Sequence, residues 1–232
     1  MLPANEWWGI LGAYGAAVWP AQAVFFLAGL IFTAFVFRSR KPIANLLMKL
    51  YLAVSFGWIS LVFFLTLGKG LAGSAFFGAL FMAVAILFAV DLFKRRMDFH
   101  LPEVTSQKRL TLGLTAVVFC YPLISIALGR PLQETIVPGT LPCPTTALAL
   151  VLLTTSLPRV DKVLYIFLLF WAIPFAPFIQ IPRYGVYEDI IMFGVGIYAL
   201  VMLVRHWNKK TVQEAKRSLP LPFIPSHQGR GE

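Results

Sequence analysis

Long apolar runs separated by short polar connections dominate the pattern of residues along the chain. Runs of roughly 18 or more apolar residues are long enough to cross the ~30 Å hydrocarbon core of a bilayer as α-helices. The pattern therefore predicts an all-α fold, a polytopic membrane helix bundle with seven transmembrane segments. The expected segments are residues 20–37, 44–67, 71–93, 110–128, 145–157, 162–181 and 188–206.

The regions outside these segments divide the chain into three parts. Residues 1–19 contain two adjacent tryptophans, and because Trp is enriched at membrane interfaces we expect an outer interfacial segment with a short helix at residues 5–14. Residues 20–207 form the transmembrane domain. Residues 208–232 are polar, basic and proline-containing, which is typical of a disordered cytoplasmic tail.

The composition agrees with a membrane location. Hydrophobic residues make up 59% of the chain and charged residues only 13%, whereas a soluble domain is about half apolar and about a quarter charged. We therefore expect a multi-pass protein of the bacterial cytoplasmic (inner) membrane, with the lipid bilayer as its main partner. The net charge of +10 does not indicate a nucleic acid partner, because the basic residues flank the predicted spans.

The distribution of basic residues predicts the orientation. With seven spans and the N-terminus outside, the connections and helix ends that face inward hold 17 of the 20 lysines and arginines, leaving Lys69, Arg130 and Arg183 outside. Cytoplasmic loops of membrane proteins carry such an excess of positive charge. We therefore expect the N-terminus outside and the C-terminus inside.

Ionisable side chains are scarce within the predicted spans, and this scarcity excludes several functions. Asp91 alone approaches the interior of a span, and an ion pair with Lys94 or Arg95 is expected at the inner interface. The seventh segment contains no lysine for a retinal Schiff base, and the histidines lie outside the spans or at a helix end, away from positions suited to haem. Motifs of zinc proteases and serine hydrolases are absent. The sequence thus indicates no catalytic residue, no metal and no cofactor.

The stretch GTLPCPTT at residues 139–146 bears on how the fifth segment begins. Proline disfavours helix at the residue before it, so Pro142 and Pro144 predict a non-helical outer part for this span. We expect Pro144 near the start of the helix and Thr145 or Thr146 as its cap. At ~1.5 Å per residue, the predicted helix reaches only about 20 Å, which is short for a span.

Two interpretations of this stretch remain open. Unwound backbone at membrane depth builds substrate sites in transporters, and a helix N-terminus favours an anion or a carbonyl dipole. Alternatively, a loop ends at the interface before a short or tilted span. For Cys143 three roles remain open. It could contact a ligand, be a small buried apolar residue, or pair with Cys120.

Further polar and aromatic residues are expected at the same outer side. Together they predict an outward-facing vestibule that binds a ligand. The alternative is that the aromatic residues form an interface belt and that the acidic pair caps the seventh helix against its dipole. The candidate ligand-binding residues are Trp19, Gln22, Pro142, Cys143, Pro144, Thr145, Thr146, Gln180, Glu188 and Asp189.

Four short motifs along the chain resemble those of a bacterial multi-pass membrane family, the domain-of-unknown-function family 6064. They are Asn5-Glu6-Trp7-Trp8, Ala17-Val18-Trp19-Pro20-Ala21-Gln22, Gly139 with Pro142-Cys143-Pro144-Thr145, and Gly185-Val186-Tyr187-Glu188-Asp189. The resemblance implies a multi-pass membrane protein and supplies no activity. Members of the family often carry a histidine after the aromatic run of the second span, whereas Phe63-Phe64-Leu65-Thr66 contains none here.

The function that these features favour is a small permease or solute-binding membrane protein. Its site would face outward at the start of the fifth helix and would bind a small molecule or an ion. The alternative is a non-catalytic sensor or accessory subunit that works with a membrane protein partner in a larger complex. An intramembrane enzyme using Cys143 ranks third, because the sequence offers no base to activate the thiol.

Overall fold

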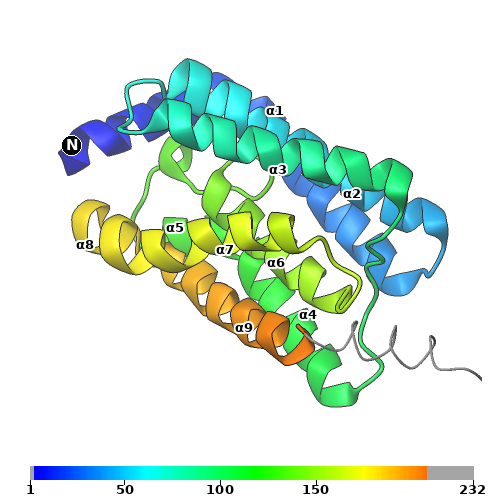
Figure 1. Cartoon of the computed structure of the whole chain (residues 1–232). Coiled ribbons are helices and arrows are strands. Elements are labelled where there is room, and N and C mark those ends of the chain that lie inside the picture. The colour runs from blue at the N-terminus through cyan, green and yellow to red at the C-terminus, as the bar shows by residue number, and fades with distance from the viewer. Residues whose placement is uncertain (1–2, 208–232) are drawn as a thin grey trace, which may run out of the picture.

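A computed structural model describes residues 3–207, and helices without any strand make up the secondary structure of that range (Figure 1). The predicted tail at residues 208–232 lies outside the described residues. The first three helices pack side by side along one edge of the bundle (Figure 1). They are α1 (Ala4–Arg38), α2 (Pro42–Trp58), which continues into the π-helical η1 (Ile59–Leu67), and α3 (Ser74–Lys94).

The remaining helices form a second group in which α6 contacts α4, α7 and α9 (Figure 1). Short π-helical and 3-10 segments connect the longer helices at one end of this group. The elements are α4 (Thr105–Phe119), α5 (Tyr121–Ala127), η2 (Leu132–Glu134), α6 (Pro142–Thr155), α7 (Lys162–Phe175), η3 (Ala176–Gln180), α8 (Ile181–Tyr184), η4 (Tyr187–Asp189) and α9 (Ile190–His206).

Several helices are long and apolar enough to cross a membrane. Residues 3–207 contain five such spans, and the number rises to six if the pair α4 and α5, bent by 52°, counts as one broken span. The fifth predicted segment, residues 145–157, corresponds to α6, which has only 14 residues and falls below the length of a span. The all-helical class is therefore confirmed, and residues 3–207 hold five to six helices that could span a membrane.

The central helix α6 is buried on every side, and all of its 14 residues are shielded from solvent. A helix that is apolar all round is typical of a core position, because no face needs to meet water. At ~1.5 Å per residue it is about 21 Å long. Its length and burial together show that α6 is the inner element around which the second group packs.

The first helix differs from the prediction. The interfacial helix expected at residues 5–14 is continuous with the first span, so that α1 is one helix of 35 residues. At ~1.5 Å per residue it is about 52 Å long, which exceeds the ~30 Å of the hydrocarbon core. The extra turns at its N-terminal end therefore reach past the other helices of the first group.

An aromatic cluster joins the two groups of helices. The ring of Trp171 on α7 packs against Phe77 and Phe81 of α3, with centroid distances of 5.1 Å in both cases. Phe64 of η1 packs edge-on against the same indole at 6.0 Å. Such pairs contribute about 0.5–1.5 kcal/mol each beyond the area they bury. The cluster therefore fixes the position of Trp171 between the groups.

A buried ion pair joins α2 to α3. Lys49 Nζ lies 2.7 Å from Asp91 Oδ2, and both side chains are less than a tenth exposed. The carboxylate also accepts hydrogen bonds from the backbone N–H groups of Arg96 and Met97. The predicted pairing of Asp91 with a basic residue on its own helix is therefore wrong, because Lys49 faces it from the neighbouring helix.

We predict that Lys49→Met lowers the free energy of unfolding by about 3–5 kcal/mol, because it leaves a buried carboxylate without its counter-ion. The double variant Lys49→Met with Asp91→Leu should recover most of this loss. Thermal and denaturant unfolding of the purified protein in detergent measures both. A double variant that is as unstable as the single one would show that the charge imbalance is not the cause.

Candidate functional site

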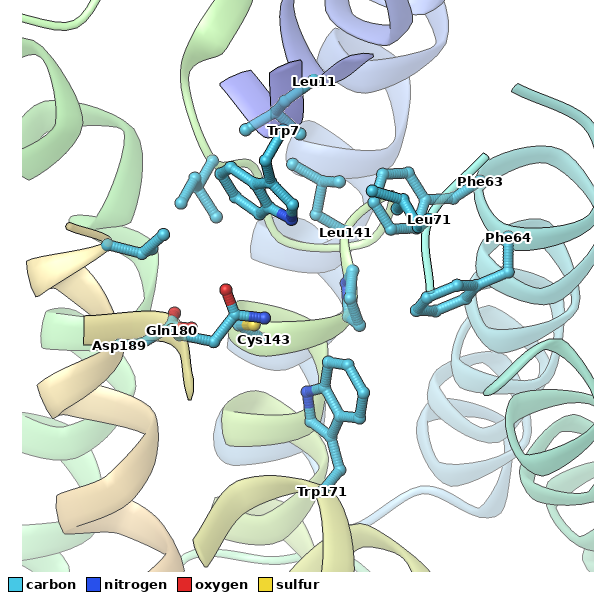
Figure 2. Close-up of a pocket in the computed structure, with 13 residues that line it drawn as sticks. Trp7, Leu11, Phe63, Phe64, Leu71, Leu141, Cys143, Trp171, Gln180 and Asp189 are labelled. Carbon is cyan, nitrogen blue, oxygen red and sulfur yellow. The ribbon is translucent and has the colours of Figure 1, made fainter. Parts of the chain in front are cut away.

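A cavity of about 50 Å³ lies at one end of the bundle, beside the start of α6. Figure 2 shows Trp7 and Leu11 of α1 on one side of it and Trp171 of α7 on the other, with Cys143 between them. Most of the walls are apolar, and polar side chains are concentrated on the floor. The lining residues are Trp7, Leu11, Phe63, Phe64, Leu71, Ile136, Leu141, Pro142, Cys143, Trp171, Gln180, Val186 and Asp189.

A hydrogen-bonded turn precedes α6 and positions its first residues beside the cavity. Gly139 adopts a φ of +96°, and its N–H donates to Thr145 Oγ1 at 2.8 Å. The same hydroxyl donates to the carbonyl of Leu141 at 2.6 Å. A positive φ suits glycine, because other residues pay for the clash of Cβ with the backbone. The threonine therefore ties the incoming loop to the first turn of the helix.

The start of α6 differs from the prediction by three residues. The helix begins at Pro142, so Cys143 is helical, and the capping position is held by Leu141 with φ −121° and ψ 146°. Proline fits the first helical turn because the N–H it lacks would have no intrahelical partner there. The extended conformation that precedes proline is thus found at Leu141, and Thr145 lies inside the helix instead of at its cap.

The floor of the cavity, formed by Cys143, Gln180 and Asp189, holds buried polar atoms without a conventional hydrogen-bond partner in the part of the chain that the structure describes. Asp189 is fully buried, Gln180 is 7% exposed, and both lie beside Cys143 (Figure 2). We call Asp189 Oδ1, Asp189 Oδ2 and Gln180 Oε1 the open acceptors, because among residues 3–207 they accept no hydrogen bond from an N–H or O–H group, and only the weak thiol donor of Cys143 faces the Asp189 carboxyl group. The Nε1 of Trp171, which is 3% exposed, is an equally open donor within that range. Burying such atoms unpaired costs about 1–3 kcal/mol each, and more when they are charged.

Cys143 lies next to the open acceptors. Its thiol is buried and free, and it neighbours the carboxyl group of Asp189 and the indole of Trp171. Cys120 is also a free thiol and is only partly buried. The two cysteines are therefore unpaired with each other, and the pairing left open by the sequence does not occur.

Glu188 is buried beside the floor, but its carboxylate binds Ser125 and does not line the cavity. Its Oε1 accepts a hydrogen bond from Ser125 Oγ at 2.8 Å, and this hydroxyl accepts one from the N–H of Ile136. Neither Glu188 nor Asp189 makes a side-chain cap at the start of α9 within residues 3–207. Asp189 nevertheless occupies the N-cap position of α9, so the acidic pair lies at the positive end of the helix dipole without forming a side-chain cap hydrogen bond.

The N-terminal turns of α1 cover the cavity. Trp8 Nε1 donates to the carbonyl of Tyr184 at 2.8 Å, and the ring of Trp7 stacks on the ring of Tyr184 at 5.1 Å. Arg130 donates to the carbonyl of Gly185 and lies 3.5 Å above the ring of Trp8. These contacts join the first residues of the chain to the loop that precedes α9. The tryptophans thus do more than anchor the chain at an interface.

Both π-helical segments contribute to the cavity. Phe63 and Phe64 come from η1, and Gln180 is the last residue of η3. In η3 the backbone of Pro177 has no hydrogen to donate, which weakens the regular α-helical ladder there. π-helical turns are often found at functional sites, because they redirect side chains without ending a helix.

The structure brings together part of the predicted site. Pro142, Cys143, Gln180 and Asp189 line the cavity. Pro144, Thr145, Thr146 and Glu188 are buried near it. Gln22 is buried elsewhere along α1, and Trp19 is 67% exposed and points away from the bundle. The prediction missed Trp7, Leu11 and Trp171 as lining residues, along with the apolar walls.

This architecture defines an all-helical protein. Five to six helices in the described range are long and apolar enough to span a membrane, and a small cavity with polar residues on its floor lies at one end. The chain belongs to the Family of unknown function (DUF6064), whose model matches residues 4–214. The resemblance found in the sequence is thereby confirmed. No curated protein and no solved structure matches the chain.

We predict that Thr145→Val lowers the free energy of unfolding by about 1–3 kcal/mol, because it removes both hydrogen bonds that tie the turn to α6. Thr154→Val is the matched control, since Thr154 is also buried on α6 but makes one bond, to the carbonyl of Val151. Thermal unfolding in detergent measures the difference. Equal losses in the two variants would contradict a special role for Thr145.

Proposed function

We propose that the chain is a small permease or solute-binding protein of the bacterial cytoplasmic membrane, with an outward-facing site at the start of α6. The observation that carries this proposal is the set of open acceptors on the floor of the cavity, contributed by Asp189 and Gln180. Buried polar groups are normally paired, and the exceptions concentrate where a ligand or water completes them. An apolar pocket with a few convergent polar groups is the usual form of a small-molecule site.

The distribution of charge supports the outward orientation. The cavity lies at the end of the bundle that holds the start of α1 and the connection between α2 and α3. Basic residues gather at the other end of α1, where Arg40, Arg95, Arg96 and Arg159 line a separate cavity. Because positive residues favour the cytoplasmic side, we propose seven spans with the N-terminus outside and the C-terminus inside.

The short central helix supports a transport function in particular. Transporters often use discontinuous helices, which end within the membrane and place their termini at the substrate. α6 has this form, because it is buried, about 21 Å long at ~1.5 Å per residue, and preceded by a turn instead of further helix. We propose that α6 is a transmembrane span as well, the fifth in chain order, which brings the total to seven. Its first turn would contact the solute.

Labelling of single cysteines tests the orientation. In a background with Cys120→Ala and Cys143→Ala, we expect a membrane-impermeant maleimide to label Lys69→Cys on intact cells. Arg159→Cys should be labelled only after the membrane is permeabilised. Both native side chains are exposed, so access to the reagent depends on the side of the membrane. The reverse pattern would overturn the proposed orientation.

Ligand binding tests the function. We expect at least one small solute from a panel of amines, carboxylates, amides and alcohols to raise the Tm of the purified full-length protein. The rise in Tm should be lost in Gln180→Leu. It should be kept in Gln107→Leu, which makes the same substitution at an exposed position outside the cavity. Uptake of the same solute into proteoliposomes would then assign a permease.

A different result would replace the proposal. If no solute shifts the Tm and the protein is always isolated with a second membrane protein, an accessory subunit is the better description. If a solute binds but is not taken up by proteoliposomes, the chain is a solute-binding protein or sensor.

A further inference from the structure

We propose that the cavity binds a small primary alkylammonium cation, with the carboxylate of Asp189 as its counter-ion. This inference rests on the proposed function and specifies the chemical class of the solute. It follows from three properties of the site, which are its charge, its balance of hydrogen-bond donors and acceptors, and the apolar character of its walls.

The charge of the site calls for a cation. Asp189 is 0% exposed, and its carboxylate forms no salt bridge within residues 3–207. Glu188, its neighbour in sequence, is 1% exposed and adds a second acidic group to this end of the bundle, where Arg130 lies over the ring of Trp8 and forms no salt bridge with Asp189 among residues 3–207. An ionised carboxylate buried without a counter-charge costs several kcal/mol. A positively charged ligand offsets that cost, whereas an anion would increase it.

The hydrogen-bond inventory calls for a donor. The open acceptors number three oxygen atoms, from Asp189 and Gln180, while the donors beside them are the Nε1–H of Trp171, the amide group of Gln180 and the weak thiol donor of Cys143. A primary ammonium group carries three N–H donors and no acceptor. It therefore matches the three oxygens of the floor, whereas a carboxylate ligand would be repelled by the carboxylate of Asp189.

The walls distinguish an organic cation from a metal ion. Calcium takes six to eight oxygen ligands, and the floor offers three open oxygens. Within residues 3–207 there is no group of three or more His, Cys, Asp and Glu side chains that could hold a metal. The remaining surface consists largely of aromatic and aliphatic groups, including the rings of Trp7 and Trp171. Such rings attract cations and also pack against an alkyl chain.

The volume sets the size of the ligand. A cavity needs roughly 10–15 Å³ of probe-occupied volume to hold one water molecule. The volume of about 50 Å³ therefore accommodates a ligand of roughly four non-hydrogen atoms. Propylammonium has this size, carries one ammonium group for the floor and presents three carbon atoms to the walls.

Isothermal titration of the purified full-length protein with three molecules of similar size tests the proposal without any variant. The probes are propylammonium, the neutral 1-propanol and the anionic propionate. We expect the Kd of propylammonium to be lower than that of either other probe by about 30-fold or more, the factor expected for a buried charge pair. Equal or tighter binding of 1-propanol or propionate would overturn the cation assignment.

A variant pair identifies the counter-ion. Asp189→Asn should weaken propylammonium binding by about 30-fold or more, while Glu6→Gln, an exposed acidic residue outside the cavity lining, should leave the Kd unchanged. Unchanged binding in Asp189→Asn would overturn the role of Asp189. If Asp189→Asn does not fold, the comparison of the three probes on the wild-type protein still decides the charge of the ligand.

The outcomes separate this inference from the function on which it rests. If propylammonium fails to bind but another solute raises the Tm in a way that depends on Gln180, the cavity is a solute site and the cation assignment is wrong. If neither propylammonium nor any solute of the panel binds, both the cation assignment and the solute-binding function are overturned.

Discussion

The complete burial of α6 is the constraint on which the rest of the structure depends. A helix with no exposed face must satisfy its backbone internally and obtain apolar neighbours on all sides, and here α2, α4, α7 and α9 supply them. The helix must also begin inside the bundle, where water cannot complete its free N–H groups. The turn closed by Thr145 and Gly139 meets this requirement, and it leaves space beside the first turn of α6. The cavity is thus a consequence of how a short buried helix starts.

Some residues of the site can be recognised from the local sequence, whereas others are placed there only by packing between distant helices. Prolines and glycine at residues 139–144 and the acidic pair before α9 are visible as local breaks in an apolar pattern, and four of the predicted residues do line the cavity. Trp171 could not be identified in this way, because an aromatic residue within an apolar span has no distinguishing neighbours. Its role depends on the position of α3 and η1, which the periodicity of its own helix does not encode.

The remaining errors have the same physical origin. Asp91 pairs across two helices with Lys49, whereas sequence spacing favours partners one turn away on the same helix. Apolar length correctly indicates the long helices, but it does not reveal that α6 is buried on every side, because a helix facing lipid and one enclosed by other helices are both apolar. The all-helical class and most helix positions were therefore predictable, while partners that lie far apart in sequence were not.

The cover over the cavity has a consequence for the order of biosynthesis. Trp7 and Trp8 emerge among the first residues, but the carbonyl and the ring that they contact belong to Tyr184, which is synthesised much later. The cover over the cavity can therefore form only after nearly all of the described helices have been synthesised. An addition to the amino terminus would lie next to these contacts and hinder this late step.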